Sequence, residues 1–415
     1  MSIEESPRSD GLKRVLRGRD ELGIIYQYII DRANYVSVKE TSGQKEKFDW
    51  EYLVRILRYH GVFPLFYRAF STTPEGNVDD VRDHLRSHYY SIVMRNQLLC
   101  SELVRILGLF KAESIEVISF KGPTLAALAY GSISQRQFAD IDLLVHFEDL
   151  EAVRQIMEAE AYWPYFRAYR RPIVRLTKAQ KRSYLRNYHE YEFRREDGMQ
   201  VDLHWHTAPR QFPFRLDPER LWSDLQIVSL EEGDVSTFSS ENLLLYLCVH
   251  GAKEQWRRLA WVIDLDRLLR AHGDMNWDII LREARNAHAT RALAFGLGLA
   301  NTLLDTAIPR EVTRTLGFDP TLTPQAACEL VFDQSPRCGP LSRVPFALCE
   351  TARDKTLYVG RSLTSSTPPD WSRIPLPDSL FWMYRGLKPL LIGARCVLAS
   401  LRKVRTWIKT LTVSL

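Results

Sequence analysis

The stretch IEVISFKGPTLAALAYGSISQRQFADIDLLV, residues 115–145, decides how this chain folds. It opens with an apolar run at 115–120, whose length and β-branched residues predict a buried strand. The residues KGPT at 121–124 interrupt that run, and an alanine- and leucine-rich segment ending at residue 130 predicts a helix. A second strand is predicted where DID at 140–142 leads into LLV. The stretch thus predicts a strand, a glycine turn, a helix and another strand.

Two carboxylates project from one face of the second predicted strand. Residues i and i+2 of a strand point to the same side, so Asp140 and Asp142 lie together while apolar side chains pack behind them. Two like charges beside an apolar strand are costly unless a cation lies between them. A third carboxylate, Asp202, lies in a later segment of strand-like alternation and would complete such a site. Oxygen ligands of this kind suit Mg²⁺, with Mn²⁺ as the alternative.

Three ordered motifs carry a family resemblance. They are FKG at 120–122, DIDLLV at 140–145 and VDLHW at 201–205. Together they resemble the polymerase-β-like nucleotidyltransferase superfamily, and within it an uncharacterised bacterial nucleotidyltransferase family linked to biosynthetic gene clusters. The resemblance implies an α/β (α+β) nucleotidyltransferase core with a small mixed sheet, flanked by N- and C-terminal helical subdomains.

The resemblance also implies a reaction. A nucleoside monophosphate, most simply AMP from ATP, would move to a hydroxyl- or phosphate-bearing acceptor, such as a natural product or modified peptide. Charge builds on the attacking and leaving oxygens in this transfer, and metal ions held by carboxylates stabilise it. Asp140, Asp142 and Asp202 are therefore the expected catalytic and metal-binding residues.

Further residues are expected to bind the nucleotide: Lys121, Gly122, Arg136, His204, His250 and Lys253. Lys121 and Gly122 stand where the superfamily commonly has a Gly-Gly or Gly-Ser turn, whose N–H groups can bind phosphate oxygens. Pro123 removes one such N–H, and the distance along the chain to Asp140 is longer than usual in the superfamily. Gly131-Ser132 is a rival for the same role, but it follows the predicted helix rather than the strand.

Alternation places Asp202, His204 and His206 on one strand face. This spacing leaves open a zinc or manganese site. The preferred interpretation is that His204 orients Asp202 or lies near the base of the nucleotide.

Each of the other nucleotide-binding candidates has an alternative reading. Arg136 precedes the Asp-x-Asp strand and either contacts phosphate or lies on the surface. His250 and Lys253 are three residues apart on a predicted helix, so they lie on neighbouring faces. Core packing is the alternative for His250.

The pattern along the chain predicts a hairpin in the core and divides the chain into five parts. A hairpin is expected within the core, because strand-like segments at 191–194 and 200–205 flank the Asp-Gly turn signal at 197–198. The parts are a flexible N-terminus (1–20), a helical N-terminal subdomain (21–112), the nucleotidyltransferase core (113–235), a helical domain (236–360), and a Pro-rich linker with a basic amphipathic C-terminal helix (361–415).

Composition indicates an ordinary globular chain of 415 residues with 45% hydrophobic and 26% charged residues and a net charge of +5. The 6 cysteines are scattered without a C-x-x-C pair, which predicts buried free thiols rather than disulfides or zinc ligands. The polar start predicts no signal peptide, and no long apolar run predicts a membrane span. We therefore expect a cytoplasmic protein.

Two basic segments leave other partners open. Residues 163–188 are rich in Arg, Lys and Tyr and could steady a triphosphate or an acidic acceptor, although nucleic acid is not the expected partner. Residues 385–415 contain Lys and Arg but no acidic residue, and they either touch a membrane peripherally or dock on the protein. A catalytically silent relative that binds nucleotide or a partner is the alternative function, favoured by Pro123 and the unusual spacing.

Overall fold

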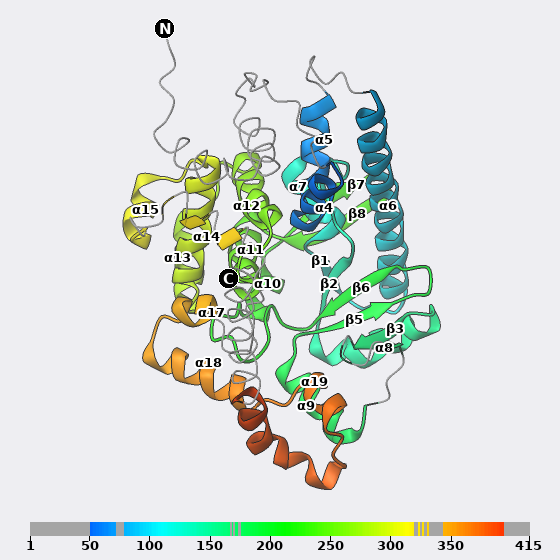
Figure 1. Ribbon diagram of the computed structural model, residues 1–415, viewed down its shortest axis with the longest axis vertical. Helices are drawn as coiled ribbons and strands as arrows, with labels where there is room; N and C mark the ends of the chain where they lie inside the picture. The colour runs from blue at the N-terminus through cyan, green and yellow to red at the C-terminus, as the bar shows by residue number, and fades with distance from the viewer. Residues whose placement is uncertain are drawn as a thin grey trace, which may run out of the picture.

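The computed structural model describes residues 50–71, 79–166, 168, 171–172, 176–318, 323, 326–327, 330–331 and 343–393. In these residues a mixed sheet lies between one long helix, α6, and a group of helices that includes α11 to α14 (Figure 1). The arrangement confirms the predicted α/β (α+β) core with a small mixed sheet and helices on both sides.

Six strands form the main sheet in the order β1-β2-β6-β5-β3-β4. Strands β2 and β6 are parallel, and every other neighbouring pair is antiparallel. The strands are β1 (Val117–Ser119), β2 (Ile141–Val145), β3 (Trp163–Phe166), β4 (Arg171–Pro172), β5 (Glu190–Arg194) and β6 (Gln200–His204). The parallel pair at the centre brings together two chain segments that the sequence marks separately with aspartates.

The predicted hairpin is present as β5 and β6. Its register pairs Glu192 with Asp202 and Glu190 with His204. On the other side of β6, Asp142 of β2 is the register partner of Asp202. Asp202 therefore has one acidic neighbour in each adjacent strand.

The predicted glycine turn lies at the start of helix α7 (Gly122–Tyr130), which joins β1 to β2. Gly122 has φ of 52°, in the left-handed region that favours glycine. A Cβ atom there would lie 2.9 Å from the backbone oxygen of Asp140. The glycine thus allows α7 to start directly against the backbone that carries the first aspartate.

A second, two-stranded sheet consists of β7 (Leu225–Leu230) and β8 (Gly233–Phe238). The sequence analysis did not predict it. Its turn is anchored on α6 (Asp79–Ala112), because Glu232 accepts hydrogen bonds from Gln97 Nε2 at 2.5 Å and from Cys100 Sγ at 3.0 Å. Helix α6 runs without interruption over 34 residues at the end of the predicted N-terminal helical subdomain.

Helices account for most of the remaining described chain. Two precede α6, namely α4 (Trp50–His60) and α5 (Phe63–Ser71). Those of the core are η2 (Phe147–Asp149), α8 (Leu150–Ala159), α9 (Lys178–Asn187) and α10 (Pro218–Ser223). Those that follow β8 are α11 (Ser240–Glu254), α12 (Leu259–Ala271), α13 (Trp277–Asn286), α14 (Thr290–Leu304), α15 (Arg310–Leu316), α17 (Arg343–Leu348), α18 (Ala352–Thr364), α19 (Pro368–Arg373) and η3 (Asp378–Met383).

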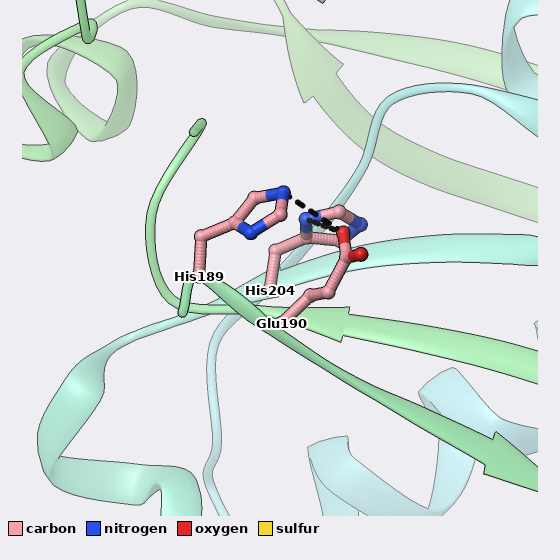
Figure 2. Close-up of side chains that lie close together, drawn as sticks. All are labelled: His189, Glu190 and His204. Carbon is pink, nitrogen blue, oxygen red and sulfur yellow. Dashed lines mark ion pairs between the residues drawn. The ribbon is translucent and has the colours of Figure 1, made fainter. Parts of the chain in front are cut away.

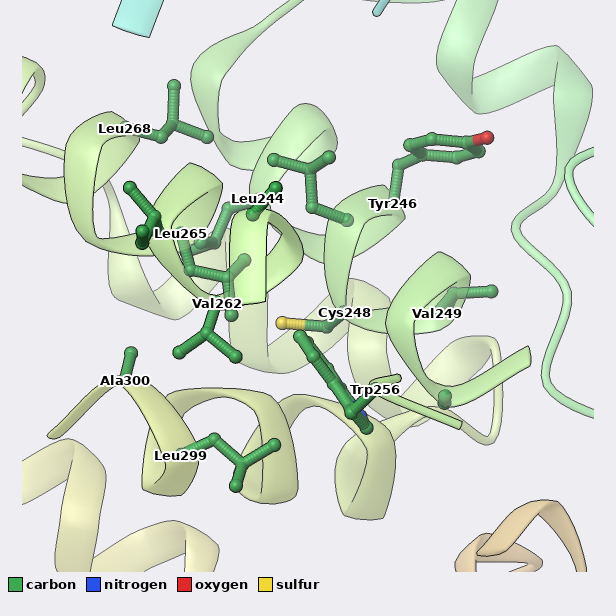
Figure 3. Close-up of a cluster of buried hydrophobic side chains, with 14 of the residues drawn as sticks. Leu244, Tyr246, Cys248, Val249, Trp256, Val262, Leu265, Leu268, Leu299 and Ala300 are labelled. Carbon is green, nitrogen blue, oxygen red and sulfur yellow. The ribbon is translucent and has the colours of Figure 1, made fainter. Parts of the chain in front are cut away.

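A buried indole organises the packing of α11 against α14. The Trp256 ring lies beside Cys248 in a cluster of apolar side chains (Figure 3). Glycines make room for it: a Cβ at Gly251 would lie 2.5 Å from the ring, and one at Gly296 would lie 2.9 Å from both the ring and Cys248 Sγ. Ridge-to-groove packing at this distance requires small residues on both helices.

Three of the cysteines, Cys100, Cys248 and Cys349, are buried and free, which confirms the prediction for these three. The other three, Cys328, Cys338 and Cys396, lie outside the described residues. None of the helices in the described part of the chain is both long and apolar enough to span a membrane.

Several predictions concern residues that the structure does not describe. These include the flexible segment 1–20, the start of the N-terminal helical subdomain up to residue 49, and residues 394–415 of the basic C-terminal segment. The basic-aromatic block at 163–188 is described only in part. The five-part division of the chain stays a prediction.

Candidate active site

A cleft of about 520 Å³ is lined by the sheet, the start of α7, and helices α11 and α12. All the predicted site residues except His204 line it: Lys121, Gly122, Arg136, Asp140, Asp142, Asp202, His250 and Lys253. His204 lies behind this wall, with 1% of its surface exposed, and reaches the site through Asp142. The fold thus gathers residues that span more than 130 positions of the chain.

The three aspartates occupy one end of the β2–β6 pair. Asp142 and Asp202 are register partners, and Asp140 immediately precedes β2. Burial and the Asp142 carboxylate raise the pKa of Asp140. Burial, with Asp140 and Glu190, raises the pKa of Asp202 well above its usual range. The three carboxylates therefore have too little positive charge around them. Their oxygen donors and their negative charge suit a Mg²⁺ ion.

Asp142 is the aspartate that the protein itself neutralises. Lys121 Nζ lies 2.7 Å from Asp142 Oδ1, and both side chains are largely buried. Burial alone would raise the pKa of Asp142, but Lys121 and His204 outweigh it and lower the pKa to about 2. Lys121 remains an ammonium for the same reason, because Asp142 outweighs the burial that would discharge it.

Behind Asp142 lies a row of polar side chains, of which Figure 2 shows His204, Glu190 and His189. His204 Nε2 lies 3.2 Å from Asp142 Oδ1, and His204 Nδ1 lies 3.3 Å from Glu190 Oε2. His189 Nε2 lies 3.0 Å from the same Glu190 oxygen and 3.0 Å from Lys253 Nζ. His204 therefore orients Asp142 in this structure, whereas the sequence had suggested that it orients Asp202.

The donor atoms of His189, Glu190 and His204 lie within 4.8 Å of one another, so by donor type this group could hold a metal ion. Lys253 argues against it. Burial lowers the pKa of His189 to about 3, with Lys253 adding to the effect, so the ring is neutral, and its Nε2 lies 3.0 Å from both Lys253 Nζ and Glu190 Oε2. The nitrogen that would bind a metal is thereby engaged, and the three aspartates remain the better place for the cation.

The zinc or manganese alternative drawn from sequence used Asp202, His204 and His206. Among the described residues, the set of three close donors that the fold assembles contains His204 but neither of the other two. His206 lies beyond the end of β6. The alternative and this group therefore share only His204, because His189 directly precedes β5 and Glu190 begins it.

Arg136 lines the cleft, but its guanidinium is engaged. Its Nε and Nη2 donate to Asp264 Oδ1 and Oδ2 at 2.8 and 2.9 Å. Tyr130 of α7 also donates to Asp264 Oδ1, at 2.7 Å. This buried group fixes α12 to the loop that leads into β2 and so holds one wall of the cleft in place.

The wall of the cleft formed by α11 and the start of α12 also carries aromatic rings and an exposed cation. His250 is neutral because burial lowers its pKa far below the usual value, with Lys121 and Lys253 acting in the same direction. Its ring lies 5.5 Å, edge to face, from that of Trp261. Arg258 lies over Trp261 at 5.8 Å, and in the described part of the chain no carboxylate pairs with it.

Several residues of this site were not predicted from the sequence, namely His189, Glu190, Glu192 and Arg258. A signal existed for the glutamates. The Asp-Gly turn at 197–198 fixes the hairpin register, and counting back from it pairs Glu192 with Asp202 and Glu190 with His204. Arg258 had no local signal, because only the packing of α12 brings it to the cleft.

A pair of aspartates and a single one on neighbouring strands, beside a glycine-led helix, define a nucleotidyltransferase-type enzyme. The chain belongs to the family described as "Uncharacterised nucleotidyltransferase", which it matches over residues 46–305. No curated protein matches the chain.

Two solved structures show similarity. The lincosamide antibiotic adenylyltransferase LnuA, in a lincomycin-bound crystal structure, is 18% identical with a TM-score of 0.29, over 40% of this chain and 94% of that one. An antigenic nucleotidyltransferase-like protein from Paracoccidioides brasiliensis is 13% identical with a TM-score of 0.30, over 54% of this chain and 92% of that one.

Proposed function

We propose that this protein transfers a nucleoside monophosphate, AMP from ATP, to a hydroxyl- or phosphate-bearing acceptor with the help of Mg²⁺. The observation that carries the proposal is the parallel register of β2 and β6, which pairs Asp142 with Asp202 beside Asp140. The choice of ATP and of a natural product or peptide as acceptor rests on the resemblance of the sequence motifs.

The aspartates would hold the cation. When bound, Mg²⁺ supplies positive charge against the oxygens on which charge develops during phosphoryl transfer. Asp140 and Asp142 project from the same strand end as ligands, and Asp202 faces them from β6. Lys121 and His204 fix the carboxylate of Asp142 in one orientation, so little reorganisation is needed when the nucleotide arrives.

Transfer requires a base on the acceptor side. Burial and Asp140 raise the pKa of Asp202, whereas the pKa of Asp142 is lowered, so Asp202 is better suited than Asp142 to accept a proton. It would take the proton of the acceptor hydroxyl while that oxygen bonds to the α-phosphorus. The bond from the α-phosphorus to the bridging oxygen breaks, and pyrophosphate leaves with the electron pair.

The walls of the cleft supply nucleotide contacts. Arg258 is an exposed cation without a carboxylate partner among the described residues, and it would bind the outer phosphates. Trp261 and His250 offer aromatic surface on which the base can stack. Lys253, held between His189 and Glu254, would steady the Glu190 side of the site.

The test is transfer of label from α-phosphate-labelled nucleoside triphosphates to acceptors in a cell extract, with each nucleotide supplied in turn. Asp142→Asn is expected to lower transfer by about 1000-fold or more, since several kcal/mol of charge stabilisation are lost. Asp305→Asn, which changes an exposed aspartate outside the cleft, serves as the matched control. Equal label from wild type and Asp142→Asn would refute the proposal.

A catalytically silent nucleotide-binding relative is the second candidate, and one contact favours it. Lys121 already neutralises Asp142, so the carboxylate has a cation partner without a metal. In this case the protein would bind ATP equally with and without Mg²⁺ and label no acceptor. Calorimetric titration of ATP in Mg²⁺ and in EDTA separates the two: metal-dependent binding supports the enzyme.

Three further expectations stay predictions. Peripheral membrane contact would require the basic C-terminal segment, of which residues 394–415 lie outside the described chain. Nucleic acid remains an unexpected partner, and cytoplasmic location remains the expectation from sequence.

A further inference from the structure

Four arginines meet on the far side of α9 from the cleft. They are Arg186 near the end of α9, Arg210 and Arg215 in the loop that follows β6, and Arg361 on α18. Arg361 Nη1 donates to the backbone oxygen of Arg210 at 2.9 Å. The backbone N–H of Arg210 donates to the oxygen of Asn187 at 3.1 Å. These two bonds tie the loop to both helices and place Arg361 against Arg210, and the electrostatic effects of Arg186, Arg210, Arg215 and Arg361 on one another make the four an arginine cluster.

Packing beneath the cluster is firm. Phe212 of the loop lies 5.8 Å from Tyr358, which precedes Arg361 by nearly one turn of α18. The loop is also closed on itself, because the N–H of Leu216 donates to Thr207 Oγ1 at 3.1 Å. The positions of Arg210, Arg215 and Arg361 are thus set by buried contacts rather than by surface side chains alone.

The cluster has charge without compensation. In the described ranges of the chain, no carboxylate pairs with any of the four guanidinium groups. Burial, followed by Arg361 and Arg210, lowers the pKa of Arg215, and burial with Arg186 and Arg361 lowers that of Arg210. Four like charges beside one another are unfavourable, the more so where one is partly removed from water.

The cluster is separate from the cleft described above. Tyr184 and Tyr188 line the cleft, whereas Arg186 lies midway between them in sequence and so points to a different side of α9. None of the four arginines lines the cleft. The aspartates and the arginine cluster are therefore two sites that different ligands could occupy at once.

We propose that the arginine cluster binds a phosphate group, either as the free ion or as part of a phosphorylated small molecule. Planar guanidinium forks match the oxygens of phosphate with paired hydrogen bonds, and a multiply charged anion offsets several cations at once. A carboxylate would offset only one. The proposal does not depend on the function of the aspartate site.

The experiment is calorimetric titration of the whole protein with inorganic phosphate, pyrophosphate and glucose 6-phosphate, all in EDTA so that no metal links phosphate to the aspartates. Wild type is expected to bind at least one of them. Arg215→Gln and Arg361→Gln are expected to weaken binding at least about 10-fold, as for loss of a charge-assisted pair. Binding of the free ion but not the ester would identify an inorganic ligand, and the reverse a phosphorylated metabolite.

Two control variants locate the site. Arg258→Gln removes the exposed cation of the cleft, and Arg314→Gln removes an exposed arginine of α15, which lies apart from α9 and α18 (Figure 1). Both are expected to bind phosphate as wild type does. Binding that is lost in Arg258→Gln and kept in the Arg215 and Arg361 variants would overturn the proposal, as would absence of binding in wild type.

A stability measurement covers variants that fold poorly. Arg186 is exposed, so Arg186→Gln is expected to raise the melting temperature in the absence of phosphate by relieving repulsion. Phosphate is then expected to raise the melting temperature of wild type more than that of the variant. An equal rise with sodium chloride at the same ionic strength would mean general screening and would also overturn the proposal.

Discussion

At the scale of single residues, the candidate site depends on how one glycine and one aspartate meet. Gly122 has φ of 52°, and the position of its missing Cβ lies 2.9 Å from the backbone oxygen of Asp140. The helix α7 can therefore start where its first turn lies against the strand that carries the aspartates. The sequence pointed to this glycine as a phosphate-binding turn, and the structure adds a steric reason for it.

Gly122→Ala tests that contact. Left-handed backbone costs an alanine about 1 kcal/mol, and the contact with a backbone atom adds to it, so we expect a loss of roughly 2–3 kcal/mol in the free energy of unfolding. Gly317→Ala is the matched control, because Gly317 has φ of 58° and no atom within 4 Å of its missing Cβ. Urea denaturation measures both. Equal losses in the two variants would show that the contact with Asp140 carries no cost.

What could be predicted at this scale followed local spacing. Asp140, Asp142 and Asp202 could be predicted because alternation within a strand is a pattern of residues close together in the sequence. The partner of Arg136 was not found, since Asp264 lies 128 positions later in the chain. Surface decoration and phosphate contact were both weighed for Arg136, and neither anticipated the buried pair.

At the scale of elements, the cleft depends on how α12 is fixed to the sheet. Asp264 of α12 accepts hydrogen bonds from Arg136 and from Tyr130 of α7, and all three side chains are buried. Helices α7 and α12, which are far apart in the sequence, are thus connected through the Asp264 carboxylate. Loss of that carboxylate would leave an unpaired guanidinium inside the protein.

Asp264→Ala is expected to lower the free energy of unfolding by about 3–5 kcal/mol, the usual result of breaking one side of a buried pair. Arg136→Met/Asp264→Leu removes both charges and is expected to recover a large part of that loss. Asp274→Asn, at an exposed position beyond the end of α12, is the control. If the double variant loses as much unfolding free energy as Arg136→Met and Asp264→Leu lose in sum, the two side chains do not act as a pair.

Helix packing gives a second prediction at this scale. A Cβ at Gly251 would lie 2.5 Å from the Trp256 ring, so Gly251→Ala must displace a buried indole and is expected to cost about 1–3 kcal/mol. Gly108→Ala in α6 meets nothing within 4 Å and is expected to stabilise the protein by up to about 1 kcal/mol, since alanine favours helix. Thermal denaturation of the two variants measures both changes in stability. A similar loss of stability in both variants would mean that the loss at Gly251 does not come from contact with the indole.

Elements with a strong local pattern were predictable, and those defined by long-range pairing were not. The sequence from β1 to β2 and the hairpin of β5 and β6 follow from apolar runs, glycine and an Asp-Gly turn. The hairpin of β7 and β8 was missed, because its polar residues hide the alternation and its turn is anchored by Gln97 and Cys100 of a distant helix.

At the scale of the whole molecule, the N-terminal helices and the helical group after the sheet are joined through a buried histidine. His60 ends α4, has no exposed surface, and accepts a hydrogen bond at Nδ1 from the N–H of Leu259 at the start of α12. Burial, with a smaller effect of Arg258, lowers its pKa from 6.5 to about 4. Net charge and composition gave no sign of this link, because both average over the entire chain.

The stability of the protein should therefore depend on pH through His60. Its pKa is lower in the folded state than in the unfolded state, so between pH 6.5 and about 4 the unfolded chain binds the extra proton. The stabilisation is fully present above pH 6.5 and is lost as the pH falls, by about 3 kcal/mol in total. Asparagine offers an oxygen to the Leu259 N–H but does not titrate in this range. Guanidinium denaturation from pH 7 to pH 4 should then show that wild type loses more unfolding free energy than His60→Asn as the pH falls. A difference that stays constant across this range would mean that the buried ring at the junction of α4 and α12 does not control how the molecule responds to acid.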